Sequence, residues 1–139
     1  MKYIKAAIAV IALVLLDQWT KVLAVTHLMN TKGVTIIPNV FRLYYLENRG
    51  SAFGLMQNQK IFFVIFTILV LAVLTLIYRK IPDTKRMLPL KIAGILIYAG
   101  AIGNFIDRVR QSYVVDFFYF ELINFPIFNV ADIYVTVAA

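Results

Sequence analysis

The sequence predicts an all-α membrane protein: a four-transmembrane-helix bundle with a small extracytoplasmic β-element between helices 1 and 2. Of its 139 residues, 62% are hydrophobic and 15% are charged, whereas a soluble domain is roughly 45 to 50% apolar and about 25% charged. The apolar residues form runs long enough to cross a bilayer. We expect one domain over residues 1–139, with spans near 4–26, 60–78, 90–108 and 126–139 and the β-element near 30–58.

The first span carries an acid and a base within the membrane. Lys2 and Lys5 precede an apolar run that taken alone resembles a secretory signal peptide. The run resumes after a short polar stretch without a cleavage site, so we expect a retained helix that enters from the cytoplasmic side. Asp17 and Lys21 lie one helical turn apart on one face. Two interpretations stay open: the pair neutralises itself and pins the helix, or it braces a site on neighbouring helices.

The segment from 27 to 59 changes character. Its β-branched and aromatic runs at 34–37 and 40–46, separated by Pro38-Asn39, predict a small β-element on the outer surface. The loop at 47–54 then combines polar side chains such as Asn48 with glycines such as Gly50, which let a backbone turn or approach a ligand closely. It is either a plain hairpin loop or part of a site.

The second span, 60–78, has no charge after its first residue and is expected to be scaffolding. Basic residues follow it at Arg79, Lys80, Lys85 and Arg86, on the side that the positive-inside rule assigns to the cytoplasm. Because this placement accounts for much of the net charge of +7, we expect no nucleic-acid partner. The chain has no cysteine and one histidine, which argues against disulfides and zinc sites built from those residues. We expect no metal and no other cofactor.

The third span is rich in small residues that permit close helix contacts, and it ends in a polar cluster. Asn104 and Arg108 share a helix face, and Asp107 is expected to form an ion pair with Arg108 or Arg110. The fourth span is expected to start near Pro126, since proline suits a first helical position. The remaining residues give about 21 Å of helix, short of a hydrocarbon core near 30 Å, so this span is expected to be cut off within the membrane.

Two acids of the polar cluster can perform hydrolysis together. Near one another in a low-dielectric site they cannot both ionise, so one keeps a proton while the other acts as a base on water. Asp116 and Asp132 are the candidates, because one follows the third span and the other opens the fourth. Serine chemistry is disfavoured, since the lone His27 is the only histidine base. The alternatives are a small proton-coupled membrane transporter that uses intramembrane acids and a non-catalytic assembly protein.

Five ordered motifs carry a resemblance to a known family. They are Asp17-Gln18-x-x-Lys21, Asn48-x-Gly50-x-Ala52-Phe53-Gly54, Gly103-Asn104-x-x-Asp107-Arg108, Val114-Val115-Asp116-Phe117 and Phe128-Asn129-x-Ala131-Asp132. The set resembles that of the bacterial lipoprotein signal peptidase family, signal peptidase II. The resemblance implies a membrane aspartyl endopeptidase that cleaves the signal peptide from prolipoproteins just before a diacylglyceryl-modified cysteine.

The resemblance also implies roles, partners and a location. Asp116 and Asp132 match the catalytic pair. The supporting or substrate-binding candidates are Asn104, Arg108, Asn129, Asn48, Gly50, Asp17 and Lys21. The implied partners are lipid-modified prolipoproteins, membrane lipids and globomycin-type cyclic peptide inhibitors. We expect a monomer in the bacterial cytoplasmic (inner) membrane, with both termini of the complete protein in the cytoplasm and the active site near the extracytoplasmic face.

Overall fold

The computed structural model describes residues 2–50 and 57–139, so the predicted loop at 47–54 lies partly outside the described residues. Within these described residues, three helices are long and apolar enough to cross a membrane, at Lys2–Leu28, Lys60–Lys80 and Lys85–Gln111. The elements in chain order are α1 (Lys2–Leu28), β1 (Val34–Ile37), β2 (Phe41–Asn48), α2 (Lys60–Lys80), the short 3-10 helix η2 (Lys85–Met87), α3 (Leu88–Gln111), β3 (Val114–Tyr119), the short 3-10 helix η3 (Glu121–Ile123) and α4 (Val130–Ala138).

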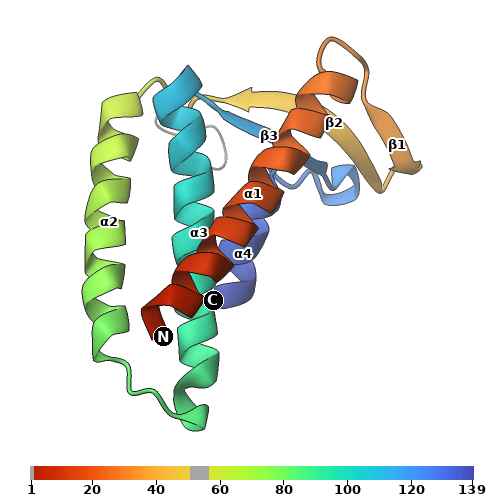
Figure 1. The fold of residues 1–139 in the computed structure, drawn as a ribbon. Helices are drawn as coiled ribbons and strands as arrows, with labels where there is room; N and C mark the ends of the chain where they lie inside the picture. The colour runs from red at the N-terminus through yellow and green to blue at the C-terminus, as the bar shows by residue number, and fades with distance from the viewer. Residues whose placement is uncertain (1, 51–56) are drawn as a thin grey trace.

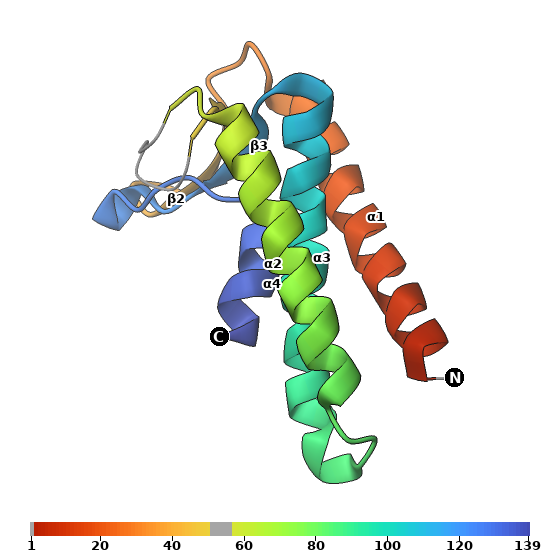
Figure 2. The same ribbon diagram turned by 90° about the vertical axis from the view of Figure 1, so that its left-hand side faces the viewer.

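Helix α3 is the centre of the bundle, and α1, α2 and α4 all pack on it (Figure 1, Figure 2). The predicted small residues allow these contacts. A side chain on Gly100 would place its Cβ 2.7 Å from the carbonyl oxygen of Ala131 in α4, and Ala99 is completely buried. The first three predicted spans agree with α1, α2 and α3 to within a few residues, whereas α4 has nine residues, so a fourth transmembrane span stays a prediction.

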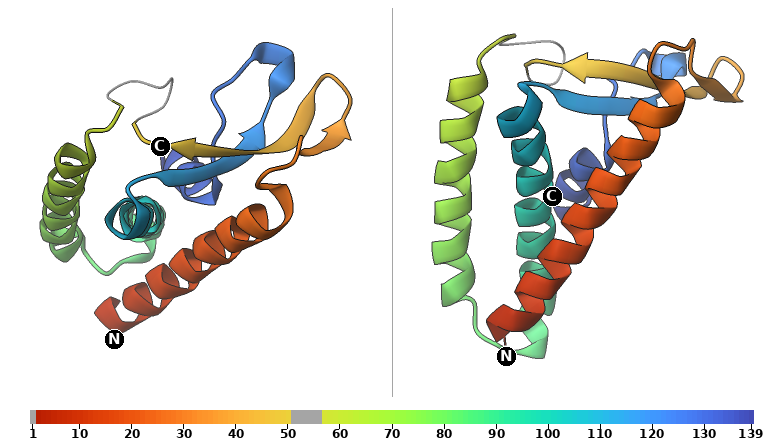
Figure 3. Two further views of the ribbon diagram at one scale, coloured as in Figure 1. Left: turned by 90° about the horizontal axis from the view of Figure 1, so that it is seen from above. Right: turned by 45° about the horizontal axis from the view of Figure 1, so that its top comes forward.

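A three-stranded antiparallel sheet projects from one end of the bundle (Figure 1, Figure 3). Strand β2 lies between β1 and β3, and its end pairs Asn48 with Val114. The prediction of a β-element between the first two spans is correct for β1 and β2 but incomplete, because the third strand follows α3. Residues Ala24 and Leu28 at the end of α1 bury against Val115 and Phe117 of β3, which fixes the sheet on the bundle.

The predicted start of the fourth helix near Pro126 is wrong, since α4 begins at Val130. Extended backbone continues past the proline, because Phe128 exchanges backbone hydrogen bonds with Phe118 of β3. Asn129 then caps the helix: its side chain accepts from the Asp132 amide at 3.0 Å, while its own amide donates to the Asp132 carboxylate at 3.1 Å. This reciprocal capping box satisfies two amides that have no partner within the helix, and so sets where the helix begins.

Candidate active site

The two predicted acids line one pocket of about 620 Å³, although they come from different elements. Asp116 lies on β3 and Asp132 in the first turn of α4. The same pocket is lined by Asn48 of β2 and by Asn104 and Arg108 of α3. Asp116 is only 2% exposed, so the fold holds a carboxyl group away from water at the point where sheet and helices meet.

Neutral amides donate to both oxygens of each carboxylate. Asn129 Nδ2 lies 2.7 Å from Asp116 Oδ1, and Asn48 Nδ2 lies 3.1 Å from Asp116 Oδ2. Asn104 Nδ2 lies 3.1 Å from Asp132 Oδ1, while the backbone amide of Asn129 donates to Asp132 Oδ2. These bonds orient the two carboxyl groups without adding a cation to either, and Asn129 contacts both.

The orientation of each amide group follows from its other partners. Lys21 can only donate, and its Nζ lies 2.9 Å from Asn104 Oδ1. The oxygen of Asn104 therefore faces the lysine and its Nδ2 faces Asp132. In the same way, Asn129 Oδ1 accepts from the backbone amide of Asp132, which leaves Asn129 Nδ2 to face Asp116. The predicted supporting asparagines are thus aligned as donors to the acids.

Behind the pocket lies a buried group that we call the lysine cluster: Asp17, Gln18, Lys21 and Asp107. Lys21 Nζ lies 2.9 Å from Asp17 and 3.2 Å from Asp107, and all three side chains are at most 4% exposed. Gln18 Nε2 donates to both carboxylates, at 3.2 and 3.1 Å. Asp17 and Lys21, which the sequence puts on one helix face, therefore form an ion pair that Asp107 shares.

The expected ion pair of Asp107 with Arg108 or Arg110 is wrong. Asp107 is buried against α1 and pairs with Lys21, because it follows Asn104 by three positions and shares its inward helix face. That spacing is the signal that could have identified it. The lysine cluster thus includes two residues, Gln18 and Asp107, that sequence reasoning did not assign to the site.

The lysine cluster also holds the two segments that carry the acids. Asp17 Oδ1 accepts from the backbone amide of Ala131 at 2.9 Å, in the first turn of α4, where the helix dipole favours a negative charge. Asp107 Oδ2 accepts from the amide of Val115 at 3.1 Å, beside Asp116. Of the two interpretations of the Asp17 and Lys21 pair, this geometry favours bracing of a neighbouring site.

Arg108 and Gly50 meet at the edge of the pocket. Arg108 Nη2 donates to the Gly50 carbonyl at 3.2 Å, and Asn48 Oδ1 accepts from the Gly50 amide at 2.9 Å. The guanidinium group lies 4.5 Å from the centre of the Phe63 ring, a favourable cation-aromatic contact. The chain after β2 is thereby held beside the two acids, and a positive charge lies at the pocket wall.

Burial is the main cause of an unusual pKa at Asp116. Burial, followed by the charge of Asp132, raises the pKa of Asp116 to about 7, although the hydrogen bonds from Asn48 and Asn129 lower it. Such a group keeps its proton close to neutral pH, while its neighbour can be ionised. Among residues 2–50 and 57–139, no group of three or more His, Cys, Asp or Glu side chains is placed to hold a metal ion. Because one carboxyl group can hold a proton while the other is ionised, the pair can supply an acid and a base.

Comparisons with known proteins agree on one family. The family described as signal peptidase (SPase) II matches residues 9–139. A lipoprotein signal peptidase of Streptococcus thermophilus is 45% identical, over 99% of this chain and 88% of its own length. Another, of Caldanaerobacter subterraneus, is 46% identical over 96% of this chain and 90% of its own length. The solved structure of a bacterial membrane enzyme superposes with a TM-score of 0.84 at 34% identity, covering 96% of this chain and 82% of that one.

Proposed function

Since the chain belongs to the signal peptidase II family, we propose that it is a membrane aspartic endopeptidase that removes signal peptides from prolipoproteins. The observation that carries the proposal is the pair Asp116 and Asp132 in one pocket, with neutral amide donors on both oxygens of each. The bond cleaved is the one just before a diacylglyceryl-modified cysteine.

The two acids act as a unit that carries one proton. The ionised carboxylate takes a proton from water as the water oxygen bonds to the scissile carbonyl carbon, and the protonated acid donates to the carbonyl oxygen. The resulting diol then collapses: the acid that took the proton from water gives it to the leaving nitrogen, and the carbon-nitrogen bond breaks. The other carboxylate takes the proton of one diol hydroxyl as the carbonyl is restored, so the pair again carries one proton. The raised pKa of Asp116 favours it as the member that holds the shared proton near neutral pH.

The supporting residues prepare the acids for this reaction. Asn104 and Asn129 orient the carboxyl groups, and the lysine cluster holds α4 and β3 in place behind them. Arg108 lies at the wall of the pocket, where a substrate carbonyl can accept its hydrogen bond. The pocket continues along apolar side chains that suit a lipid chain or a signal helix, Phe120, Ile123, Ile133 and Val137.

The location follows from charge. By the positive-inside rule, the basic residues at the N-terminus and between α2 and α3 favour a cytoplasmic location for that end of the bundle. The sheet and the pocket would then lie at the extracytoplasmic face of the bacterial cytoplasmic membrane. A site built by one chain needs no second copy, so a monomer suffices. Globomycin-type cyclic peptides would compete for the same pocket. A proton-coupled transporter finds no support, since the relatives are named as peptidases.

The test is cleavage of a purified diacylglyceryl-modified prolipoprotein in lipid or detergent. Asp116→Asn and Asp132→Asn are each expected to lower the rate by about 10² to 10⁴-fold, the range for loss of a general acid or base. Asp83→Asn is the matched control, because Asp83 lies between α2 and α3 with a 70% exposed side chain, and it should cleave at the normal rate. Melting curves establish that each variant is folded. Normal cleavage by a folded Asp116 or Asp132 variant would disprove the dyad.

A further inference from the structure

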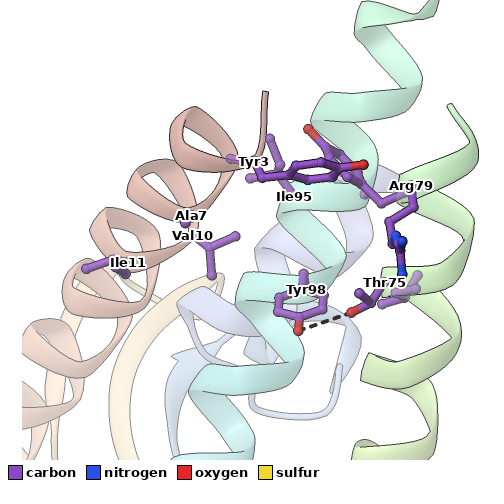
Figure 4. Close-up of a pocket in the computed structure, with 12 residues that line it drawn as sticks. Tyr3, Ala7, Val10, Ile11, Thr75, Arg79, Ile95 and Tyr98 are labelled. Carbon is purple, nitrogen blue, oxygen red and sulfur yellow. Dashed lines mark hydrogen bonds between the residues drawn. The ribbon is translucent and has the colours of Figure 1, made fainter. Parts of the chain in front are cut away.

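A second large pocket, of about 570 Å³, is lined by residues of α1, α2 and α3, none of which lines the candidate active site (Figure 4). Helices α1 and α2 each pack on α3, and the pocket is the groove that they leave between them, with α3 as its floor. Tyr3 of α1 and Tyr78 of α2 approach each other at its end, with ring centres 6.4 Å apart. Lys2 crosses the same gap and donates to the carbonyl of Ile81 at 2.6 Å.

Three small residues leave room in the groove beside larger side chains such as Ile95 and Tyr98. Ala6 and Ala7 line it from α1, and Gly94 lines it from α3. Its lining is apolar apart from Arg79, Thr75 and the hydroxyl groups of three tyrosines. The hydroxyl groups of Thr75 and Tyr98 lie 3.3 Å apart, away from the end at which Tyr3 and Arg79 lie (Figure 4). The volume falls within the roughly 300 to 1,000 Å³ of ordinary ligand pockets. Such a surface within a membrane suits a hydrocarbon chain.

Positive charge gathers at one end of this groove, and we call Lys2, Lys5, Arg79 and Lys80 the basic rim. Arg79 lines the groove itself, and Lys2 Nζ lies 5.4 Å from the centre of the Tyr78 ring. Asp83 is the one acid in the connection between α2 and α3. A hydrogen bond from Lys91, then the charges of Lys91, Lys2 and Lys5, lower the pKa of Asp83. The rim therefore offers cations in excess.

We propose that this groove binds one anionic phospholipid, with an acyl chain against the walls of α1, α2 and α3 and the phosphate at the basic rim. The charge selects this occupant. The signal peptide of a substrate begins with a positively charged region, which the rim would repel. A second copy of this chain carries the same rim and would be repelled too. A neutral lipid gains the apolar contacts but leaves the cations unpaired. The site is separate from the two acids and does not rest on the proposed peptidase activity.

Native mass spectrometry of the purified protein tests the proposal, with phosphatidylglycerol and phosphatidylcholine of equal chain length as probes. We expect one phosphatidylglycerol per protein, held more tightly than phosphatidylcholine. Arg79→Gln should weaken phosphatidylglycerol about fivefold, as expected for one basic residue near an anionic headgroup. Lys85→Gln is the matched control, because Lys85 belongs to the same basic connection but does not line the groove, and it should change the affinity less than twofold.

A second pair of variants tests the apolar walls. Ala7→Leu puts a larger side chain into the groove and should abolish the retained lipid, whereas Ala12→Leu, at an exposed position of α1 outside the groove, should not. Three results would overturn the proposal. They are equal retention of the two lipids, an equal loss of affinity in Arg79→Gln and Lys85→Gln, and undiminished lipid binding by a folded Ala7→Leu variant. Since no cleavage is measured, each of these results leaves the proposed peptidase untouched.

Discussion

Removing the cation of the lysine cluster should cost much of the stability of the fold. Lys21→Met keeps an unbranched chain of similar length but leaves Asp17 and Asp107 facing each other without their shared ion pair. Both carboxyl groups are buried, at 0% and 1% exposed, so water cannot replace the lysine. The variant also removes the donor that orients Asn104 towards Asp132.

The expected magnitude follows from this burial. Breaking a buried ion pair by removing one partner costs about 3 to 5 kcal/mol, out of a total of roughly 5 to 15 kcal/mol for a whole protein. For a chain of this size, the loss corresponds to a melting temperature roughly 10 to 20 °C lower. Cleavage should fall as well, because the bonds from Asp17 to Ala131 and from Asp107 to Val115 hold the segments that carry the two acids.

Melting curves in one detergent, followed by tryptophan fluorescence or light scattering, measure the effect. Lys91→Met is the matched control: Lys91 also pairs with an aspartate, but that partner, Asp83, has a 70% exposed side chain, so water replaces the lysine and little change is expected. Adding Asp17→Asn and Asp107→Asn to Lys21→Met should recover part of the loss by removing the unpaired charges. A Lys21→Met protein that melts within about 2 °C of the wild type would refute the reasoning.

Three further outcomes can be measured. Burial and the Asp132 charge raise the pKa of Asp116 from its ordinary 3.8 to about 7, so the folded protein keeps a proton that the unfolded chain releases. Stability should therefore fall as the pH rises from about 4 to about 7, and the melting temperature of Asp116→Asn should depend less on pH over that range. Equal pH dependence of the wild-type and Asp116→Asn melting temperatures would contradict the raised pKa. Gly103→Ala drives a methyl group into the Asp17 carboxylate and should lower the free energy of unfolding, measured by chemical denaturation, by about 1 to 3 kcal/mol. Gly94→Ala, whose Cβ would lie 3.4 Å from the Tyr78 ring, should be neutral or slightly stabilising. An equal loss in both variants would contradict the close contact at Gly103. Arg108→Ala loses the bond to Gly50 and the donor for a substrate carbonyl, and should slow prolipoprotein cleavage about 10² to 10³-fold. Arg110→Ala, at an exposed position, should cleave normally. An Arg108→Ala protein as active as the wild type would exclude the role proposed for the arginine.

The features that the sequence predicts well depend on the local sequence or on requirements that the membrane imposes on it. Three helices were placed to within a few residues, because long apolar runs are required to cross hydrocarbon. The acids and asparagines of the site stand out for the same reason, since polar groups in such a chain are costly unless they are paired. Their placement around one pocket follows from the order of the spans and needs no knowledge of side-chain contacts.

The features that the sequence did not predict depend on contacts between distant segments. Residues 113–119 are rich in β-branched and aromatic residues. Their role as the third strand depends on pairing with β2, from which α2 and α3 separate them in the sequence. Pro126 suits a first helical turn, yet the bridge from Phe128 to Phe118 keeps the chain extended for three more residues. For Asp107, neighbouring arginines in sequence were misleading, because adjacent helix positions point in different directions and the partner comes from α1.

Asn129 both caps α4 and donates a hydrogen bond to Asp116, and few other residue types can do both. As a helix cap it could be replaced by serine or threonine, which also offer an oxygen to the first turn. Neither can also supply the fixed amide nitrogen that donates to Asp116 while the oxygen caps α4. Saturation mutagenesis at this position should therefore give two different lists: several residues that yield folded protein, and asparagine alone when cells are selected for processed lipoproteins. Position 129 would tolerate variation in a screen for expression and reject it in a screen for lipoprotein processing.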